Sequence, residues 1–267
     1  MWLFFVILAL GVLYLFLIAP RMIKRPDYSV LFGVHYAHRG LFDNTSDAPE
    51  NSLRAMRKAI RAGYGIEFDV QLSKDDIPVV FHDASLKRMC NVDGNVWEYT
   101  MEELKQMRLL ESEQTIPTLD EVLKVIDGQV PLIIEYKMDR ADTKVCEFGN
   151  AILEKYKGTY CIESFHPLAV SWYQKNRPDV IRGQLSENYA KDGKKQAYLR
   201  VMTYLLTNFW TRPDFIAYKH QDWRNASRCI CRALGALSVA WTVKSKEQYE
   251  EIKEKFDLFI FDSCELK

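Results

Sequence analysis

The sequence lacks an excess of either charge. Its 36 lysines and arginines balance 36 aspartates and glutamates, so the formal net charge at pH 7 is zero. A protein that binds nucleic acid needs a basic surface to neutralise phosphates, and this balance argues against such a partner. The sequence also has no internal repeat and no low-complexity segment, which leaves an ordinary globular chain.

Cysteine and histidine are scarce. Of the six cysteines, only Cys229 and Cys231 lie close together, and neither a second pair nor a histidine follows at the spacing of a zinc site. Only five histidines are present. Two of them, His38 and His82, end apolar runs beside acidic residues, which favours proton transfer over a purely structural role.

The N-terminal segment lacks charge. No charged residue occurs from Trp2 to Ala19, and as a helix this run would be about 27 Å long, close to the hydrocarbon core of a bilayer. No lysine or arginine precedes it, and no small-residue cleavage site follows, which disfavours a cleaved signal peptide. Arg21, Lys24 and Arg25 come directly afterwards. We therefore predict a single-pass membrane protein whose catalytic domain is cytoplasmic.

The rest of the chain alternates short β-branched runs with amphipathic helical segments. Such alternation predicts parallel strands joined by crossover helices, and a single (β/α)8 barrel needs about this length. The expected helices include 52–62, 119–126, 143–155 and 246–255. The strand candidates are 36–38, 66–70, 79–82, 132–135, 160–165, 180–184, 215–218, 239–243 and 258–261. These are nine candidates for eight barrel strands, and 215–218 is the least secure.

We divide the chain into three parts. Residues 1–25 form the predicted transmembrane helix with its basic flank, 26–35 a linker, and 36–267 the α/β TIM barrel. Residues 84–117 are too long for a simple connection between strand and helix. We predict that they form a small insertion after the third strand, over the mouth of the barrel.

Three carboxylates fall on two predicted strands. Glu67 and Asp69 are two residues apart, so their side chains point to the same face, and Glu135 lies on a second strand. A structural salt bridge is one interpretation. The acids lie within apolar runs, however, and need a cation when buried, so we favour a site for Ca²⁺ or Mg²⁺.

Two cations and a fourth acid accompany these carboxylates. Arg39 follows the first histidine and has the fork geometry that binds phosphate, although it could pair with Glu50 or Asp83 instead. Lys137 shares the face of Glu135 and could neutralise charge that develops on a phosphoryl group. Glu50 opens a predicted helix, and its side chain could turn toward the metal.

These motifs together resemble the glycerophosphodiester phosphodiesterase family, in the family's order and over residues 34–263. The matching segments are AHRG at 37–40, PENS at 49–52, IEFDV at 66–70, VFHD at 80–83, PTLDEVL at 117–123, IEYK at 134–137, SF at 164–165 and WTV at 241–243. The start of the insertion, 86–91, diverges from the family's pattern. The resemblance implies a metal-dependent barrel that hydrolyses glycerophosphodiesters to sn-glycerol 3-phosphate and an alcohol.

The resemblance also implies a role for each matching residue. His38 and His82 are the implied general acid/base pair, and Trp241 the residue that lines the barrel mouth. The implied metal ligands are Glu67, Asp69 and Glu135, with Glu50 a candidate for the same shell; the implied phosphate ligands are Arg39 and Lys137. The implied partner is a small-molecule substrate.

Other functions fit parts of the pattern. An apolar stripe within 195–210, containing Tyr198, Met202, Leu205, Leu206, Phe209 and Trp210, could pack on the barrel or form a lip at a membrane. A lip would suit a lysophospholipase D that acts on acylated substrates. A catalytically dead scaffold is a weaker alternative because no catalytic residue is missing. A phosphatidylinositol-specific phospholipase C also uses two histidines but matches the paired acid motifs less well.

Overall fold

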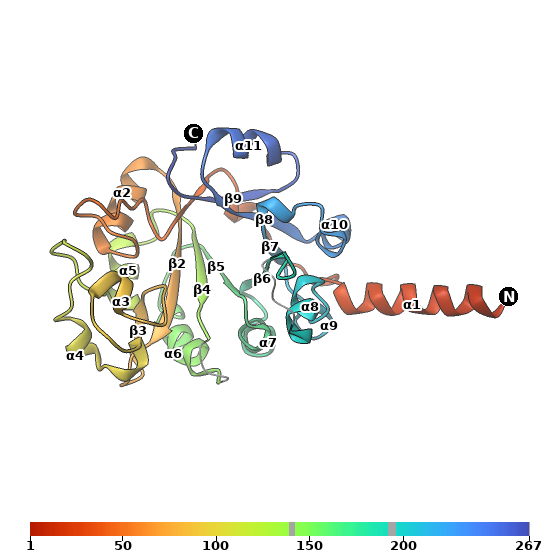
Figure 1. Cartoon of the computed structure of the whole chain (residues 1–267), viewed down its shortest axis with the longest axis horizontal. Helices are drawn as coiled ribbons and strands as arrows, with labels where there is room; N and C mark the ends of the chain where they lie inside the picture. Colours follow the sequence, from red (N-terminus) through yellow and green to blue (C-terminus); the bar gives the residue numbers. More distant parts are fainter. Residues whose placement is uncertain (139–141, 192–195, 267) are drawn as a thin grey trace.

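The computed structural model describes residues 1–138, 142–191 and 196–266 and has a closed barrel at its centre (Figure 1). Eight parallel strands form it, and β1 pairs with both β2 and β9, so these eight strands close on themselves. The strands are β1 (Tyr36–His38), β2 (Gly65–Leu72), β4 (Leu132–Tyr136), β5 (Tyr160–Ser164), β6 (Ile181–Ser186), β7 (Phe215–Lys219), β8 (Leu237–Val243) and β9 (Leu258–Phe261). The predicted TIM barrel is confirmed.

The ninth strand lies outside the parallel barrel. β3 (Pro78–Val80) pairs antiparallel with β2 as a hairpin. Parallel strands need a crossover of a dozen or more residues, whereas only residues 73–77 separate β2 from β3. The surplus strand is therefore β3, and the candidate at 215–218, the least secure in the sequence, is barrel strand β7.

Helices cover the outside of the barrel. Around it run α2 (Leu53–Ala62), α5 (Leu119–Ile126), α6 (Lys144–Leu153), α7 (Pro167–Asn176), α8 (Ala197–Thr203), α9 (Asn208–Thr211), α10 (Ala226–Ala233) and α11 (Lys246–Ile252), with 3₁₀ turns η1 (Ser29–Leu31) and η3 (His220–Asp222). Helix α2 illustrates how the sequence sets the first and last residues of such a helix. The Ser52 hydroxyl accepts a hydrogen bond from the Ala55 N–H, and Gly63 ends the helix in a left-handed conformation.

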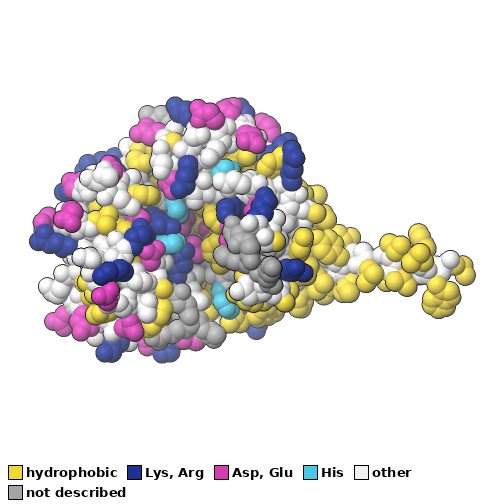
Figure 2. Space-filling model, in the orientation of Figure 1, with side chains coloured by type: hydrophobic (Ala, Val, Ile, Leu, Met, Phe, Trp, Pro, Cys, Tyr) yellow, Lys and Arg dark blue, Asp and Glu magenta, His cyan; other side chains and the backbone are white. Residues whose placement is uncertain are grey.

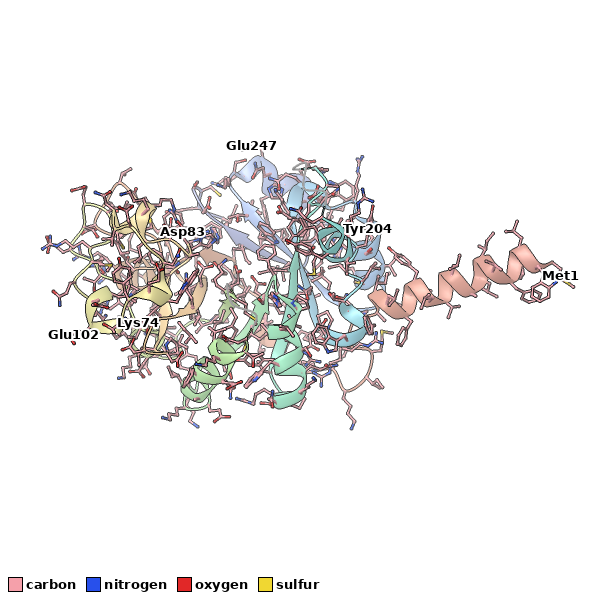
Figure 3. The ribbon with its side chains drawn as sticks, turned by 60° about the horizontal axis from the view of Figure 1, so that its bottom comes forward. Met1, Lys74, Asp83, Glu102, Tyr204 and Glu247 are labelled. Carbon is pink, nitrogen blue, oxygen red and sulfur yellow. The ribbon has the colours of Figure 1, made fainter. Side chains whose placement is uncertain are left out.

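Residues 84–117 lie between β3 and β4. They contain α3 (Lys87–Cys90), η2 (Val96–Glu98) and α4 (Met101–Leu104), and a capping box from Thr100 and Glu103 opens α4. The segment has a separate apolar cluster that includes Leu86, Met89 and Leu104. In Figure 3, Asp83 lies on this side of the barrel and Tyr204 on the opposite side, nearer the N-terminal helix.

The inside of the barrel has an apolar layer and a polar layer. Side chains from alternate strand positions fill the lower layer, among them Tyr36, Ile133, Phe215 and Ile260. Gly183 makes room for this filling, because a Cβ at this position would lie 2.0 Å from the Phe215 ring. Toward the C-terminal ends of the strands, the side chains that point inward are acidic or basic. The candidate site lies at this edge of the barrel.

The N-terminal helix α1 (Trp2–Ile18) corrects the membrane prediction. It extends away from the barrel with exposed apolar side chains (Figures 1 and 2). It ends one residue earlier than predicted because Pro20 disfavours helical backbone at Ala19, which is extended. Its 17 residues reach about 26 Å. Among the described residues, no helix has the length and apolar character needed to span a bilayer, so the predicted single-pass topology is wrong.

The apolar stripe forms two short helices rather than one. Leu205 has a positive φ of 56° and separates α8 from α9. Leu205 is buried in the main apolar cluster, and Met202 is buried in a small separate cluster with Leu199, whereas Tyr198 and Phe209 are exposed. Lys195, at the start of the predicted segment, lies outside the described residues. The stripe therefore packs on the barrel through only part of its side chains.

Candidate active site

The predicted site residues gather at the C-terminal ends of the barrel strands. His38 ends β1, Glu67 and Asp69 lie on β2, and Glu135 lies on β4. The others are Arg39 and Glu50 after β1, His82 after β3, Lys137 after β4 and Trp241 on β8. Histidine side chains are visible along the middle of the face in Figure 2, flanked by acidic and basic groups. This is the edge where TIM barrels hold their active sites.

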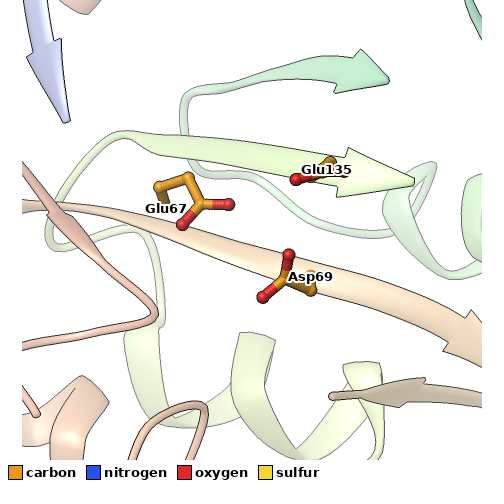
Figure 4. A group of neighbouring side chains, drawn as sticks. All are labelled: Glu67, Asp69 and Glu135. Carbon is orange, nitrogen blue, oxygen red and sulfur yellow. The ribbon is translucent and has the colours of Figure 1, made fainter. Parts of the chain in front are cut away.

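The three carboxylates form one buried cluster. One oxygen each from Glu67, Asp69 and Glu135 lies within 4.8 Å of the others, and the three side chains point toward one another (Figure 4). Burial, followed by the neighbouring charges of Asp69 and Glu135, raises the pKa of Glu67 well above its ordinary value. Hard carboxylate oxygens brought together in this way fit a divalent cation such as Ca²⁺ or Mg²⁺.

Two basic side chains partly balance this negative charge. The Lys137 Nζ lies 2.7 Å from Glu135 Oε1 and 2.9 Å from Asp69 Oδ1. Arg39 has a left-handed backbone, and its N–H donates to Glu67 Oε2 at 3.1 Å. Burial alone would lower the pKa values of Lys137 and Arg39, but the carboxylates outweigh it and raise both. Both side chains therefore remain cationic at the cluster.

Each histidine is held by an aspartate through Nδ1. His38 Nδ1 lies 3.1 Å from Asp262 Oδ2, and its Nε2 lies 4.0 Å from Glu67 Oε2. His82 Nδ1 lies 2.6 Å from Asp83 Oδ1. In both rings this contact fixes a proton on Nδ1 and leaves Nε2 to exchange one. Burial lowers the pKa of His38, although Asp262 opposes the effect, so the ring is neutral near pH 7.

Glu50 has partners other than the carboxylate cluster. Its oxygens accept hydrogen bonds from Arg39 Nη1 at 2.7 Å, Arg88 Nη2 at 2.6 Å and Asn44 Nδ2 at 2.9 Å. Among the described residues, the group that could hold a metal ion contains Glu67, Asp69 and Glu135 without Glu50. The contacts thus place Glu50 between the guanidinium groups of Arg39 and Arg88, rather than in the metal shell predicted for it. This is the salt bridge that the sequence offered as the alternative role of Arg39.

Trp241 lies across the barrel mouth from the carboxylates. Its ring meets Phe165 edge-on, with centroids 5.4 Å apart. The indole Nε1 is buried and has no hydrogen-bond partner among residues 1–138, 142–191 and 196–266. A buried donor of this kind is costly unless a group accepts from it, and the predicted contact of Trp241 with the substrate stays a prediction.

Comparison with known proteins shows the family of this chain. The model of the glycerophosphoryl diester phosphodiesterase family matches residues 38–260. The chain belongs to the glycerophosphoryl diester phosphodiesterase family. A glycerophosphodiester phosphodiesterase of Caldanaerobacter subterraneus is 31% identical over 243 residues, covering 86% of this chain and 93% of the relative. One of Bacillus altitudinis is 31% identical over 157 residues, which is 54% of this chain and 63% of that relative.

Solved structures agree with this membership. An Oleispira antarctica phosphodiesterase in complex with the product sn-glycerol 3-phosphate has a TM-score of 0.72 and 25% identity, and the alignment covers 88% of this chain and 94% of that one. A Thermotoga maritima glycerophosphodiester phosphodiesterase has a TM-score of 0.65 and 27% identity, with 87% and 96% covered. Our chain is therefore an enzyme that hydrolyses glycerophosphodiesters.

The structure adds site residues of this phosphodiesterase that the sequence did not single out. Asp262 follows β9, and its carboxylate contacts His38. Its position directly after the last strand is the feature of the sequence that could have indicated a site residue. Arg88, in the divergent start of the insertion, bridges Glu50 and Asp83. The Asn51 side chain donates to Asp69 Oδ2 at 2.9 Å, whereas the next residue, Ser52, caps α2. Glu163 is buried opposite Glu135 on β5.

Proposed function

We propose that a divalent cation held by Glu67, Asp69 and Glu135 serves the hydrolysis of glycerophosphodiesters at this site. When bound, the cation would withdraw electron density from a non-bridging phosphate oxygen. The observation that carries this proposal is the convergence of three buried carboxylates, which meet the two cations Lys137 and Arg39 among the residues that the structure describes. A third positive centre would balance the charge of the cluster.

The basic residues bind and orient the phosphate in this proposal. Arg39 and Lys137 are held by carboxylates on the rim, so both cationic groups stay close to the place where phosphate charge develops. Glu50 holds the guanidinium of Arg39 through Nη1, and Arg39 Nε lies 3.5 Å from Asp69 Oδ2. The unpartnered indole N–H of Trp241 is a further donor for the substrate.

The two histidines move the protons. Nδ1 of each ring is directed to an aspartate, so Nε2 of one ring accepts the proton of the attacking hydroxyl and Nε2 of the other donates to the departing alkoxide. Asp262 and Asp83 act as positioning residues that hold the tautomers. Asp83 is itself held by Arg88, which links the insertion to this proton transfer.

Hydrolysis of glycerophosphocholine by the full chain, followed by release of glycerol 3-phosphate, tests the proposal. We expect activity to vanish with EDTA and to return with Ca²⁺ or Mg²⁺. Calorimetric titration of both metals into the wild type and Glu135→Gln supplies a readout independent of turnover. Activity that survives exhaustive chelation, or equal metal binding by the two proteins, would contradict the metal site.

A further inference from the structure

An ion pair lies on the side of the barrel mouth opposite the carboxylate cluster. In the closed order of the eight parallel strands, β7 is four strands away from β2 in either direction, so the two strands face each other across the barrel. Lys219 is the last residue of β7, and its Nζ lies 2.8 Å from Oε2 of Glu187, the residue that follows β6. The pair therefore lies across the mouth from Glu67 and Asp69.

Both side chains of the pair point into the mouth. Leu185 and Ala217 belong to the apolar layer inside the barrel, and residues two apart on a strand share a face. Glu187 and Lys219 follow these two residues by two positions, so they lie one layer closer to the mouth. Their side chains are 13% and 33% exposed. A ligand in the mouth can therefore reach both charged groups.

An apolar pocket lies between the carboxylate cluster and the segment that carries Glu187. The pocket has a volume of about 460 Å³, and its walls include Glu135, Phe165, Tyr189 and α8. Burial, followed by the charges of Glu187 and Glu135, raises the pKa of the Tyr189 phenol, so this ring lies within range of both carboxylates. A substrate whose phosphate is held at the cluster can therefore extend toward the ion pair.

The surroundings of the pair limit the headgroup that it can accept. Trp241 is the register partner of Lys219 on β8, so an indole lies beside the pair and reduces its contact with water. A charge left without a partner in such a place is costly. A headgroup with one charge, such as choline, could pair with Glu187 but would bring a like charge to Lys219. An ammonium and a carboxylate on one headgroup match both members of the pair, and they bind more strongly than neutral hydroxyls.

We propose that Glu187 and Lys219 bind a leaving alcohol that carries both an ammonium and a carboxylate, of which serine is the simplest, and so select glycerophosphoserine. The inference rests on the proposed function and names its leaving group. In the net reaction, the hydroxyl of water bonds to phosphorus, and the bond from phosphorus to the serine oxygen breaks. That oxygen takes the remaining proton, and the products are sn-glycerol 3-phosphate and serine.

Headgroups of similar size are the first test. The full chain with Ca²⁺ or Mg²⁺ is assayed for release of glycerol 3-phosphate from glycerophosphoserine, from glycerophosphoethanolamine, which lacks the carboxylate, and from the 3-hydroxypropionate diester, which lacks the ammonium. We expect kcat/KM for the serine diester to exceed that for each analogue by about ten-fold or more, because each analogue lacks one ionic contact.

Two outcomes separate this inference from the function on which it rests. A kcat/KM for either analogue, or for uncharged glycerophosphoglycerol, that equals or exceeds the value for the serine diester would overturn the subsite alone. No product from any of these diesters or from glycerophosphocholine would overturn the proposed function as well.

Single variants assign each charge. Lys219→Met should lower the preference for the serine diester over the ethanolamine diester by about ten-fold, and Glu187→Gln should do the same for its preference over the 3-hydroxypropionate diester. Lys105→Met is the control, because Lys105 also pairs with a glutamate, Glu121, and is similarly exposed, at 31%. The control should keep both wild-type ratios, and wild-type ratios in either variant of the pair would overturn the assignment.

A charge exchange separates recognition from folding. The double variant Glu187→Lys with Lys219→Glu keeps an ion pair at the same two positions but exchanges the places of the ammonium and the carboxylate. Exchange of these two groups on the Cα of serine gives its mirror image. The double variant should therefore reverse the wild-type order of kcat/KM between the L-serine and D-serine diesters. An unreversed order, or a wild type that does not distinguish the two diesters, would overturn the subsite.

Discussion

The two halves of the barrel contribute differently to this enzyme. The first half, from β1 to β4, carries the three clustered carboxylates, both histidines and the two cations, Arg39 and Lys137, that we propose bind phosphate. The second half, from β5 to β9, contributes Asp262 and Trp241 to the site and, through Phe165 and α8, most of the apolar pocket. The charged residues of the site are therefore concentrated in the first half, and the apolar walls of the pocket in the second half.

This difference separates turnover from substrate choice. Proton transfer and metal binding need fixed atoms at fixed distances, so the first half is held by short ion pairs such as Lys137–Glu135 at 2.7 Å. An apolar pocket needs only volume and a surface of suitable chemistry, which many side chains supply. Changes in the first half should therefore lower kcat on every substrate, and changes in the second half should alter KM and selectivity.

The largest effect should come from the carboxylate cluster. Asp69→Asn removes one charge from the group that could hold the metal and weakens the contacts to Lys137 and Asn51. We expect kcat to fall by about 10³-fold or more on all phosphodiesters. Asp47→Asn, which changes an exposed aspartate paired with Arg54, is the matched control and should stay within two-fold of the wild type. Steady-state kinetics at saturating metal would show the difference, and similar kcat values for the two variants would contradict the metal role.

The histidines should give the next largest effect. His38→Ala and His82→Ala should each lower kcat by about 10²-fold or more, because general acid/base catalysis contributes about this much. Asp262→Asn should act more mildly on kcat. Asp262 raises the pKa of His38, so its removal should move the acidic limb of the pH–rate profile to lower pH. A near wild-type kcat in both alanine variants would exclude the predicted pair.

A smaller effect should come from the link between the insertion and the barrel. Burial alone would raise the pKa of Glu50, but hydrogen bonds from Arg88 and the charge of Arg39 outweigh it and hold the pKa at about 2. Because this folded-state pKa is depressed, the stabilising contribution of Glu50 is complete above its ordinary pKa of 4.5 and is lost as the pH falls toward 2.

Arg88→Met should therefore raise the pH midpoint of acid unfolding, measured by circular dichroism, and lower kcat by about ten-fold through its loss of contact with Asp83. Lys87→Met, one residue earlier on an exposed ion pair, is the control and should change neither quantity. An acid midpoint unchanged from the wild type would show that this link does not stabilise the fold.

The smallest effect should come from Trp241 in the second half. Trp241→Phe keeps an aromatic ring against Phe165 but removes the buried N–H that has no partner among the described residues. We expect KM for glycerophosphocholine to rise about two- to five-fold while kcat stays within two-fold. A fall in kcat with unchanged KM would instead show that the indole N–H stabilises the transition state. The second half would then contribute to turnover as well as to substrate binding.

Much of the fold and the site followed from local sequence. Residues two apart on a strand share a face, so the pairing of Glu67 with Asp69 was predictable from spacing alone. The strand pattern by itself did not show which of the nine candidates lies outside the barrel. The connection at 73–77 is too short for a parallel crossover, and its length excludes β3 from the parallel strands. The membrane prediction failed because a helix of 17 residues is marginally too short, and its end depended on the backbone before Pro20.

The sequence by itself therefore indicated the barrel and the residue types of the site, because strand periodicity and acidic motifs are local patterns. The reaction class came from the resemblance of those motifs to a known family. Only the tertiary structure decided which partners these residues have. Arg88 meets Glu50 across 38 positions, and Asp262 meets His38 across 224. The pocket between Phe165 and Met202 likewise arises from segments distant in sequence. Contacts of this kind depend on closure of the sheet, which brings β9 beside β1.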